Sequence, residues 1–163
     1  MNAVIEAVAS GIRRCVVVAL ATVLLASCSS AWAALGQDVA SVENDRAQMQ
    51  GSRSVVEERD YTIHEIQAPT GTLVREYVHP DGTVFAVAWD GPFVPNLRQL
   101  LGAYFAPFAE AAKAQQARHA RRGALRIETP DLVVETGGHM RAFFGRAYLP
   151  AQLPRALAEG GLR

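Results

Sequence analysis

The chain has 163 residues, half of them hydrophobic and a fifth charged, which is the composition of an ordinary folded protein with one domain. Its 16 basic and 16 acidic side chains cancel, so no overall field attracts polyanions, and we expect no nucleic-acid partner. Both cysteines, Cys15 and Cys28, lie near the N-terminus, which excludes a disulfide or a cysteine nucleophile in the rest of the chain.

Residues 1–33 are predicted to be a signal peptide. Arg13 and Arg14 precede the apolar run CVVVALATVLLA, which is too short for a bilayer span of roughly 20 residues but fits a signal peptide. AWA predicts cleavage between Ala33 and Ala34, whereas LASC resembles a lipobox and predicts a lipid at Cys28. We favour cleavage and release into the periplasm. The alternative is an outer-membrane lipoprotein, attached to the membrane only through that lipid.

Residues 34–60 are predicted to form an N-terminal helix and a connector. Val39, Val42 and Met49 recur at helical spacing, Asp38 suits the N-cap and Gly51 suits the stop. The stretch SRSVVEERD that follows is polar and weakly patterned, so we interpret it as a connector.

Residues 61–150 are predicted to form an α+β core domain. The runs YTIHEIQ, TLVREYV and TVFAVAW are separated by the turns APTG and HPDG, which predicts three antiparallel strands. Both faces of the third run are apolar, so we place this strand at the centre of the sheet. ALRIE, LVVET and HMRAFFGRAYL predict three more strands, the last with a bulge at Gly145.

A wide apolar stripe from Asn96 to Arg118 predicts a long helix, capped by Asn96, that covers one face of the sheet. Pro107 lies inside the stripe and lacks a backbone donor, so a kink or a break into two helices is predicted near Tyr104. We therefore expect an antiparallel sheet of about five to six strands packed on one long, kinked helix. Residues 151–163 contain a proline and two adjacent glycines and are predicted to be a flexible tail.

The sequence contains no recognised catalytic or metal-binding motif. The histidines lack the spacing of a helical metal site, and the glycines of ETGGHMR precede a strand rather than the helix that a phosphate loop needs. We therefore expect no cofactor and favour a non-enzymatic protein. An envelope enzyme with a histidine and carboxylate site is the alternative. Its candidate residues are His64, His79, His139, Glu65 and Asp81.

The segment WDGPFVP is the best candidate for a recognition loop. It carries Trp89, Asp90 and Phe93 on a turn defined by glycine and proline at the end of a strand, where side chains are held but not buried. We therefore predict an exported binding or accessory domain whose partner is an unidentified envelope component or protein. This loop or an edge of the sheet would make the contact. A lipid-anchored assembly factor is a third interpretation.

Several runs carry a family resemblance. VREYV, GTVFAVAWDGP, NLRQLLG and GRAYLP, together with AWAALG before them, resemble an exported bacterial family called domain of unknown function 2844. The resemblance covers essentially the whole chain after the signal peptide. It implies export and a single domain that begins near ALG, which favours cleavage after Ala33. It implies no reaction, cofactor or catalytic residue.

Overall fold

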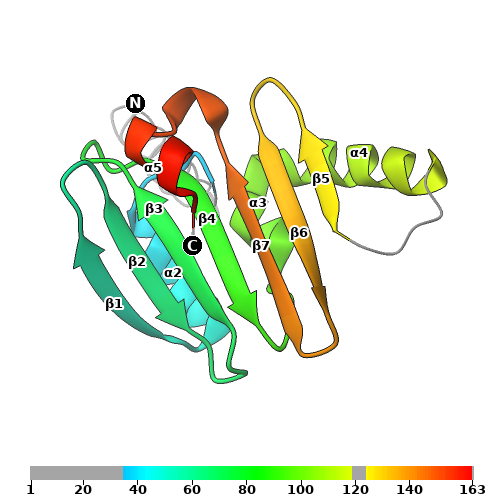
Figure 1. Cartoon of the computed structure of the whole chain (residues 1–163). Coiled ribbons are helices and arrows are strands. Elements are labelled where there is room, and N and C mark those ends of the chain that lie inside the picture. Colours follow the sequence, from blue (N-terminus) through cyan, green and yellow to red (C-terminus); the bar gives the residue numbers. More distant parts are fainter. Residues whose placement is uncertain (1–34, 119–123, 163) are drawn as a thin grey trace, which may run out of the picture. The chain divides into compact units, whose positions relative to one another are not determined.

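The computed structural model of the chain describes residues 35–118 and 124–162. The predicted cleavage site at Ala33 and Ala34, the lipid site at Cys28 and the histidine at position 119 lie outside these residues. The described part is built on an antiparallel sheet of seven strands, more than the five to six predicted. Its order is β1-β2-β3-β4-β7-β6-β5 (Figure 1). The strands are β1 (Ser52–Glu57), β2 (Thr62–Gln67), β3 (Leu73–Val78), β4 (Val84–Gly91), β5 (Leu125–Glu128), β6 (Val133–His139) and β7 (Ala142–Tyr148).

The three predicted strands after residue 60 are confirmed as β2, β3 and β4. They are joined by the predicted turns, in which Gly71 and Gly82 adopt a positive φ of 90°. β4 is the middle strand of the seven, and its first six residues are all buried, as its apolar faces predict. The bulge is not at Gly145, because β7 runs through that residue in regular register. It lies between β3 and β4, where Phe85 is the extra residue opposite the Tyr77–Val78 step.

The predicted connector after Gly51 was wrong in part, because Ser52–Glu57 forms the edge strand β1. All six of its residues are exposed, so the alternation of buried and exposed residues that identifies most strands is missing. The helix before it is confirmed as α2 (Ala40–Met49). Its N-cap residue is Val39 and not the predicted Asp38, although Asp38 Oδ1 accepts a hydrogen bond from the Ala40 N–H.

The long helix predicted from Asn96 is divided, as expected, into α3 (Leu97–Leu101), the 3₁₀ turn η1 (Gly102–Tyr104) and α4 (Phe105–Arg118). The Asn96 side chain accepts a hydrogen bond from the backbone N–H of Gln99, which confirms the predicted cap. Pro107 cannot donate a backbone hydrogen bond to the preceding turn, which accounts for the break just before it. No helix in residues 35–118 and 124–162 is long and apolar enough to span a membrane.

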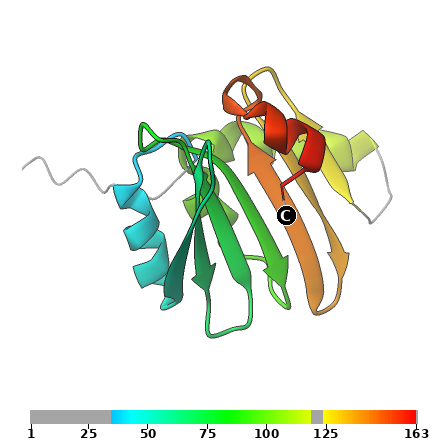
Figure 2. The same cartoon turned by 60° about the vertical axis from the view of Figure 1, so that its left-hand side comes forward.

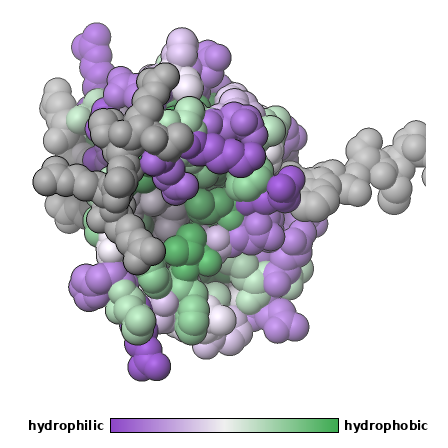
Figure 3. All heavy atoms as spheres, turned by 90° about the vertical axis from the view of Figure 1, so that its right-hand side faces the viewer, coloured by the Kyte–Doolittle hydropathy of each residue, from purple (hydrophilic) through white to green (hydrophobic). Residues whose placement is uncertain are grey.

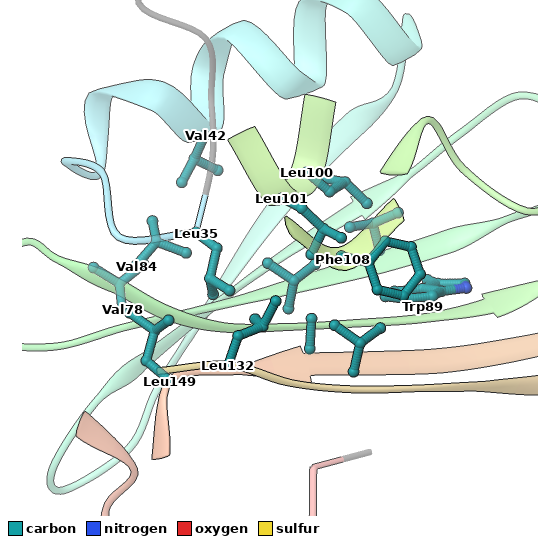
Figure 4. Close-up of a cluster of buried hydrophobic side chains, with 14 of the residues drawn as sticks. Leu35, Val42, Val78, Val84, Trp89, Leu100, Leu101, Phe108, Leu132 and Leu149 are labelled. Carbon is teal, nitrogen blue, oxygen red and sulfur yellow. The ribbon is translucent and has the colours of Figure 1, made fainter. Parts of the chain in front are cut away.

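Helices cover both faces of the sheet. Figures 1 and 2 show α2, α3 and α4 on one side, here called the helical face, and α5 (Arg155–Gly160) on the other, here called the α5 face. The main core lies under the helical face, where Leu35, Val42, Leu100, Leu101 and Phe108 pack on the strands (Figure 4). Most of residues 151–162 are not a flexible tail as predicted. The 3₁₀ turn η2 (Pro150–Gln152) leads into α5, and Leu157 and Leu162 are buried on the α5 face.

Candidate functional site

The three residues of the predicted recognition loop lie in different environments. Trp89 is only 2% exposed and belongs to the main core, contrary to the expectation that its side chain is held but not buried, although it borders two surface hollows. Its ring lies directly over Gly145, where any Cβ would overlap it. Asp90 is exposed and forms an ion pair with Arg75 at 2.6 Å. Phe93 is 59% exposed, so it is the one aromatic side chain of the loop that is available for contact.

The loop that carries Phe93 is held against the neighbouring turn. The hydroxyl of Thr72 donates a hydrogen bond of 2.9 Å to the Phe93 carbonyl. Gly91 lies so close to Thr72 that a Cβ on it would be 2.6 Å from the Thr72 Cα. Because the backbone is held on both sides of Pro92, the loop that carries Phe93 has a defined position, so less backbone entropy is lost on binding.

Four exposed apolar side chains occur at this end of the sheet, here called the apolar end: Phe93, Val94, Met140 and Phe144, which are 59%, 49%, 84% and 56% exposed. The register places Phe144 at this end, because Asp90 and Gly91 at the end of β4 pair with Phe144 and Phe143 of β7. Met140 lies at the tip of the hairpin that joins β6 and β7. Exposed apolar groups that gather in this way are typical of interaction sites.

A hollow of about 360 Å³ lies within the apolar end. Val94, Phe143 and Phe144 line it together with the backbone of Gly137 and Gly138. Hydrophobic residues also gather in the middle of the face beside α4 and β5, among hydrophilic ones (Figure 3). The apolar end therefore combines projecting side chains with a recess, which suits a partner that contributes an apolar group of its own.

A second hollow, of about 350 Å³, lies on the α5 face above Ala88. Its charged lining is already paired, because Glu135 forms an ion pair with Arg146 at 2.6 Å and Asp90 pairs with Arg75. A ligand with either charge would have to compete with these ion pairs, so this hollow is the weaker candidate.

Sequence reasoning missed a buried polar cluster on the helical face. It consists of Asp45 on α2, Glu76 on β3 and Gln99 on α3, which are 0%, 1% and 3% exposed. The Nε2 of Gln99 donates a hydrogen bond to Asp45 Oδ1. Asp45 Oδ2 and Glu76 Oε1 are buried without a donor among the described residues, and the two carboxyl groups are close enough for a proton on one of them to join the pair. The signal that could have revealed it is the position of Glu76, two residues from both Val74 and Val78 in a predicted strand. Residues two apart share one face of a strand, so Glu76 is a carboxylic acid on the apolar face.

Burial determines the protonation of this cluster. It raises the pKa of Glu76 well above its ordinary value of 4.5, the neighbouring charge of Asp45 raises that pKa further, and Arg53 opposes the increase. Burial also raises the pKa of Asp45, while hydrogen bonds from Glu76 and Gln99 counteract this effect. A hydrogen bond between two carboxyl groups needs one proton, which we assign to Glu76. The cluster is thus a shared-proton pair enclosed between the sheet and two helices.

The structure does not bring the candidate histidines together. His64 is buried on the helical face, and its strand neighbour Glu65 points to the α5 face and pairs with Arg75. Burial and, to a smaller extent, Arg53 lower the pKa of His64. His79 Nε2 lies 2.7 Å from the Gln152 carbonyl.

The remaining two histidine candidates lie at opposite ends of the sheet. His79 follows β3, beside the start of β4, whereas His139 ends β6, on the side of the sheet where β4 ends. Asp81 accepts a hydrogen bond from the Thr83 N–H, which is the main reason that its pKa is lowered, and the charge of His79 makes a smaller contribution. His79 and Asp81 line one open hollow of about 650 Å³, but neither His64 nor His139 joins them there, and His79 Nε2 is already in contact with the Gln152 carbonyl.

Comparison with known families and proteins gives one match. A family with the description "Protein of unknown function (DUF2844)" matches residues 31–160, which confirms the resemblance noted in the sequence. No curated protein and no solved structure matches the chain.

Proposed function

We propose that this chain, which belongs to the DUF2844 family of proteins of unknown function, is a non-enzymatic binding domain whose contact surface is the apolar end. The observation that carries the proposal is the exposure of Phe93 on a loop fixed by Thr72. Binding is favourable when a partner covers this ring, because apolar surface is removed from water. The loop backbone is already fixed, so less conformational entropy is lost when the partner binds. The partner we propose is a protein or another component of the cell envelope.

The alternative of an envelope enzyme has less support in the geometry. Its histidine candidates are distributed over the core and the two ends of the sheet. The Asp45–Glu76 pair is the strongest acid–base feature of the described residues, but both side chains are buried beneath helices, at most 1% exposed. General acid–base catalysis needs contact with a reacting group, which that enclosure denies.

We further propose that the protein is exported to the periplasm and released by cleavage after Ala33. This part rests on the sequence of residues 1–33, with a lipid at Cys28 and a role as an anchored assembly factor as the competing interpretation. The intact mass of the protein from soluble and membrane envelope fractions tests it. A mass that begins at Ala34 supports release, and a lipid-modified mass that begins at Cys28 overturns it.

Photo-crosslinking in the producing cells tests the binding surface. A photoreactive residue at Met140, which is 84% exposed, should give a defined adduct, whereas one at Glu110 on the exposed side of α4 should not. Adding Phe93→Ser should lower the yield from position 140 severalfold. The matched exchange Val56→Ser, at an apolar side chain that is 41% exposed on β1, should leave it unchanged. Equal adduct yields at positions 140 and 110, or equal effects of the two serine variants, would reject the proposal.

A further inference from the structure

The first edge of the sheet is uncovered. β1 pairs with β2 alone, in a register without interruption from Ser52 to Glu57, and contains no proline or bulge that would prevent further pairing. Val55 and Val56 are 46% and 41% exposed. An edge strand of this kind presents unpaired N–H and C=O groups and is a template for another strand.

We propose that the occupant of this edge is β1 of a second copy of the chain, in antiparallel pairing about a twofold axis through Val55. In that register Val55 faces Val55, and Arg53 of each copy faces Glu57 of the other. Arg53, Val55 and Glu57 all lie on the helical face of β1, because residues two apart along a strand share a face. Two pairs of opposite charge therefore flank a pair of apolar side chains.

The neighbouring registers lack this complementarity. Directly opposed residues of two antiparallel strands lie on the same face of the sheet. The register between two copies of β1 can therefore change only in steps that pair residues of one face, and the twofold axis must pass through a residue position and not between two residues. An axis through Ser54 places Arg53 opposite Val55, and an axis through Val56 places Arg53 opposite Arg59. Only the axis through Val55 gives two pairs of opposite charge and no pair of like charge.

The charges that the pairing needs are available. Among the described residues Glu57 forms no ion pair, and the contact of Arg53 with Glu43 is long, at 3.7 Å. The Arg53 side chain is 32% exposed and lies at the free edge of the sheet. Cross-strand pairs of opposite charge stabilise antiparallel sheets, and like charges directly opposite destabilise them. The sequence of β1 is thus complementary to itself.

Charge reversal tests the pairing. Sedimentation equilibrium of the purified protein should show a dimer. Arg53→Glu and Glu57→Arg should each raise its Kd by on the order of tenfold, because each places like charges opposite one another. The double variant Arg53→Glu/Glu57→Arg restores opposite charges in the same register and should recover the wild-type Kd. Lys113→Glu, the same charge change on exposed α4, should have no effect. Near-UV circular dichroism verifies that each variant is folded.

A direct contact measurement completes the test. A photoreactive residue at Val55 should crosslink two copies, and mass spectrometry should locate the adduct within residues 52–57 of the second copy. A protein that is monomeric throughout, a dimer indifferent to Arg53→Glu, or a double variant no better than the single ones overturns the inference. So does an adduct at position 55 that forms only with a different protein.

Discussion

Replacing Glu76 by Gln should change how the stability of the protein depends on pH. Glu76 is 1% exposed, and burial together with the charge of Asp45 raises its pKa well above the ordinary value of 4.5. Glutamine has nearly the same shape, stays neutral at every pH and can donate an N–H to Asp45. The variant therefore removes the ionisation of residue 76, while Asp45 remains ionisable, and it keeps the packing and a hydrogen bond.

The magnitude follows from proton linkage. Below about pH 4.5 the Glu76 carboxyl is protonated in both the folded and the unfolded chain, so it adds no pH dependence. At higher pH the unfolded chain releases this proton while the folded protein retains it. The free energy of unfolding then falls, by up to about 1.4 kcal/mol per pH unit, until the pH reaches the pKa of the folded state. Glu76→Gln lacks this loss, so its stability relative to the wild type should rise with pH at up to that rate.

Urea unfolding between pH 4 and pH 9 measures the effect, with fluorescence of the buried Trp89 as the signal. His64, whose pKa is lowered by burial, contributes the opposite trend, since its stabilisation is lost as the pH falls below 6.5. It lies directly opposite Glu76 in the β2–β3 register, so the two profiles are compared well above pH 6.5, where His64 is neutral in both proteins. Glu110→Gln, the same exchange on exposed α4, should follow the wild-type profile. Parallel profiles for the wild type and Glu76→Gln would show that the folded protein does not hold Glu76 protonated.

Three further predictions concern the packing and ends of the elements. Gly145→Ala should lower the free energy of unfolding by about 1–3 kcal/mol in urea titrations, because its methyl group would overlap the buried ring of Trp89. Gly137→Ala should cost much less, because its methyl group would approach the outer end of the exposed Phe144 ring and, at 3.4 Å, the Cβ of Ala124. Asn96→Ala should lower stability by about 1 kcal/mol through loss of the cap of α3, seen as a reduced Tm in calorimetry, and Asn96→Ser should restore most of it. Leu101→Ala, at a fully buried position, should cost about 3–5 kcal/mol in the same titrations, and an unchanged midpoint would contradict its place in the core.

Local sequence signals predicted most of the fold because the elements concerned are amphipathic or bounded by turn residues. β4 was placed at the centre from its two apolar faces, and the break of the long helix from Pro107. β1 escaped prediction for the opposite reason. Its six residues are exposed on both faces, so nothing in their hydropathy distinguishes them from a loop. Strand pairing with β2, a nonlocal property, is what makes this segment a strand.

The candidate site was predicted less well than the fold. Phe93 and Trp89 belong to the same short segment, yet one ring is exposed and the other lies in the main core. Trp89 can be buried because Gly145 of β7 leaves room for its indole ring. This glycine lies more than fifty residues away in the chain, so its place beside Trp89 cannot be inferred from the loop sequence. The Asp45–Glu76 pair likewise forms only when α2 packs on the sheet. Its one local sign in the sequence was Glu76, an acidic residue on the apolar face of a predicted strand.

The two proposed surfaces can be tested separately because they lie on different parts of the sheet. The apolar end lies where β4 stops and the β6–β7 hairpin turns, whereas the pairing edge is β1, three strands away from β4. In a dimer related by a twofold axis through Val55, the two copies of β1 run in opposite directions, so the two apolar ends point away from each other. Each copy could then hold its own partner, without overlap between the sites. Arg53→Glu should therefore weaken the dimer while leaving crosslinking from position 140 intact, and Phe93→Ser should have the reverse effect. If one substitution abolished both signals, binding and pairing would have to be coupled, and a single interface made of both surfaces would replace the two described above.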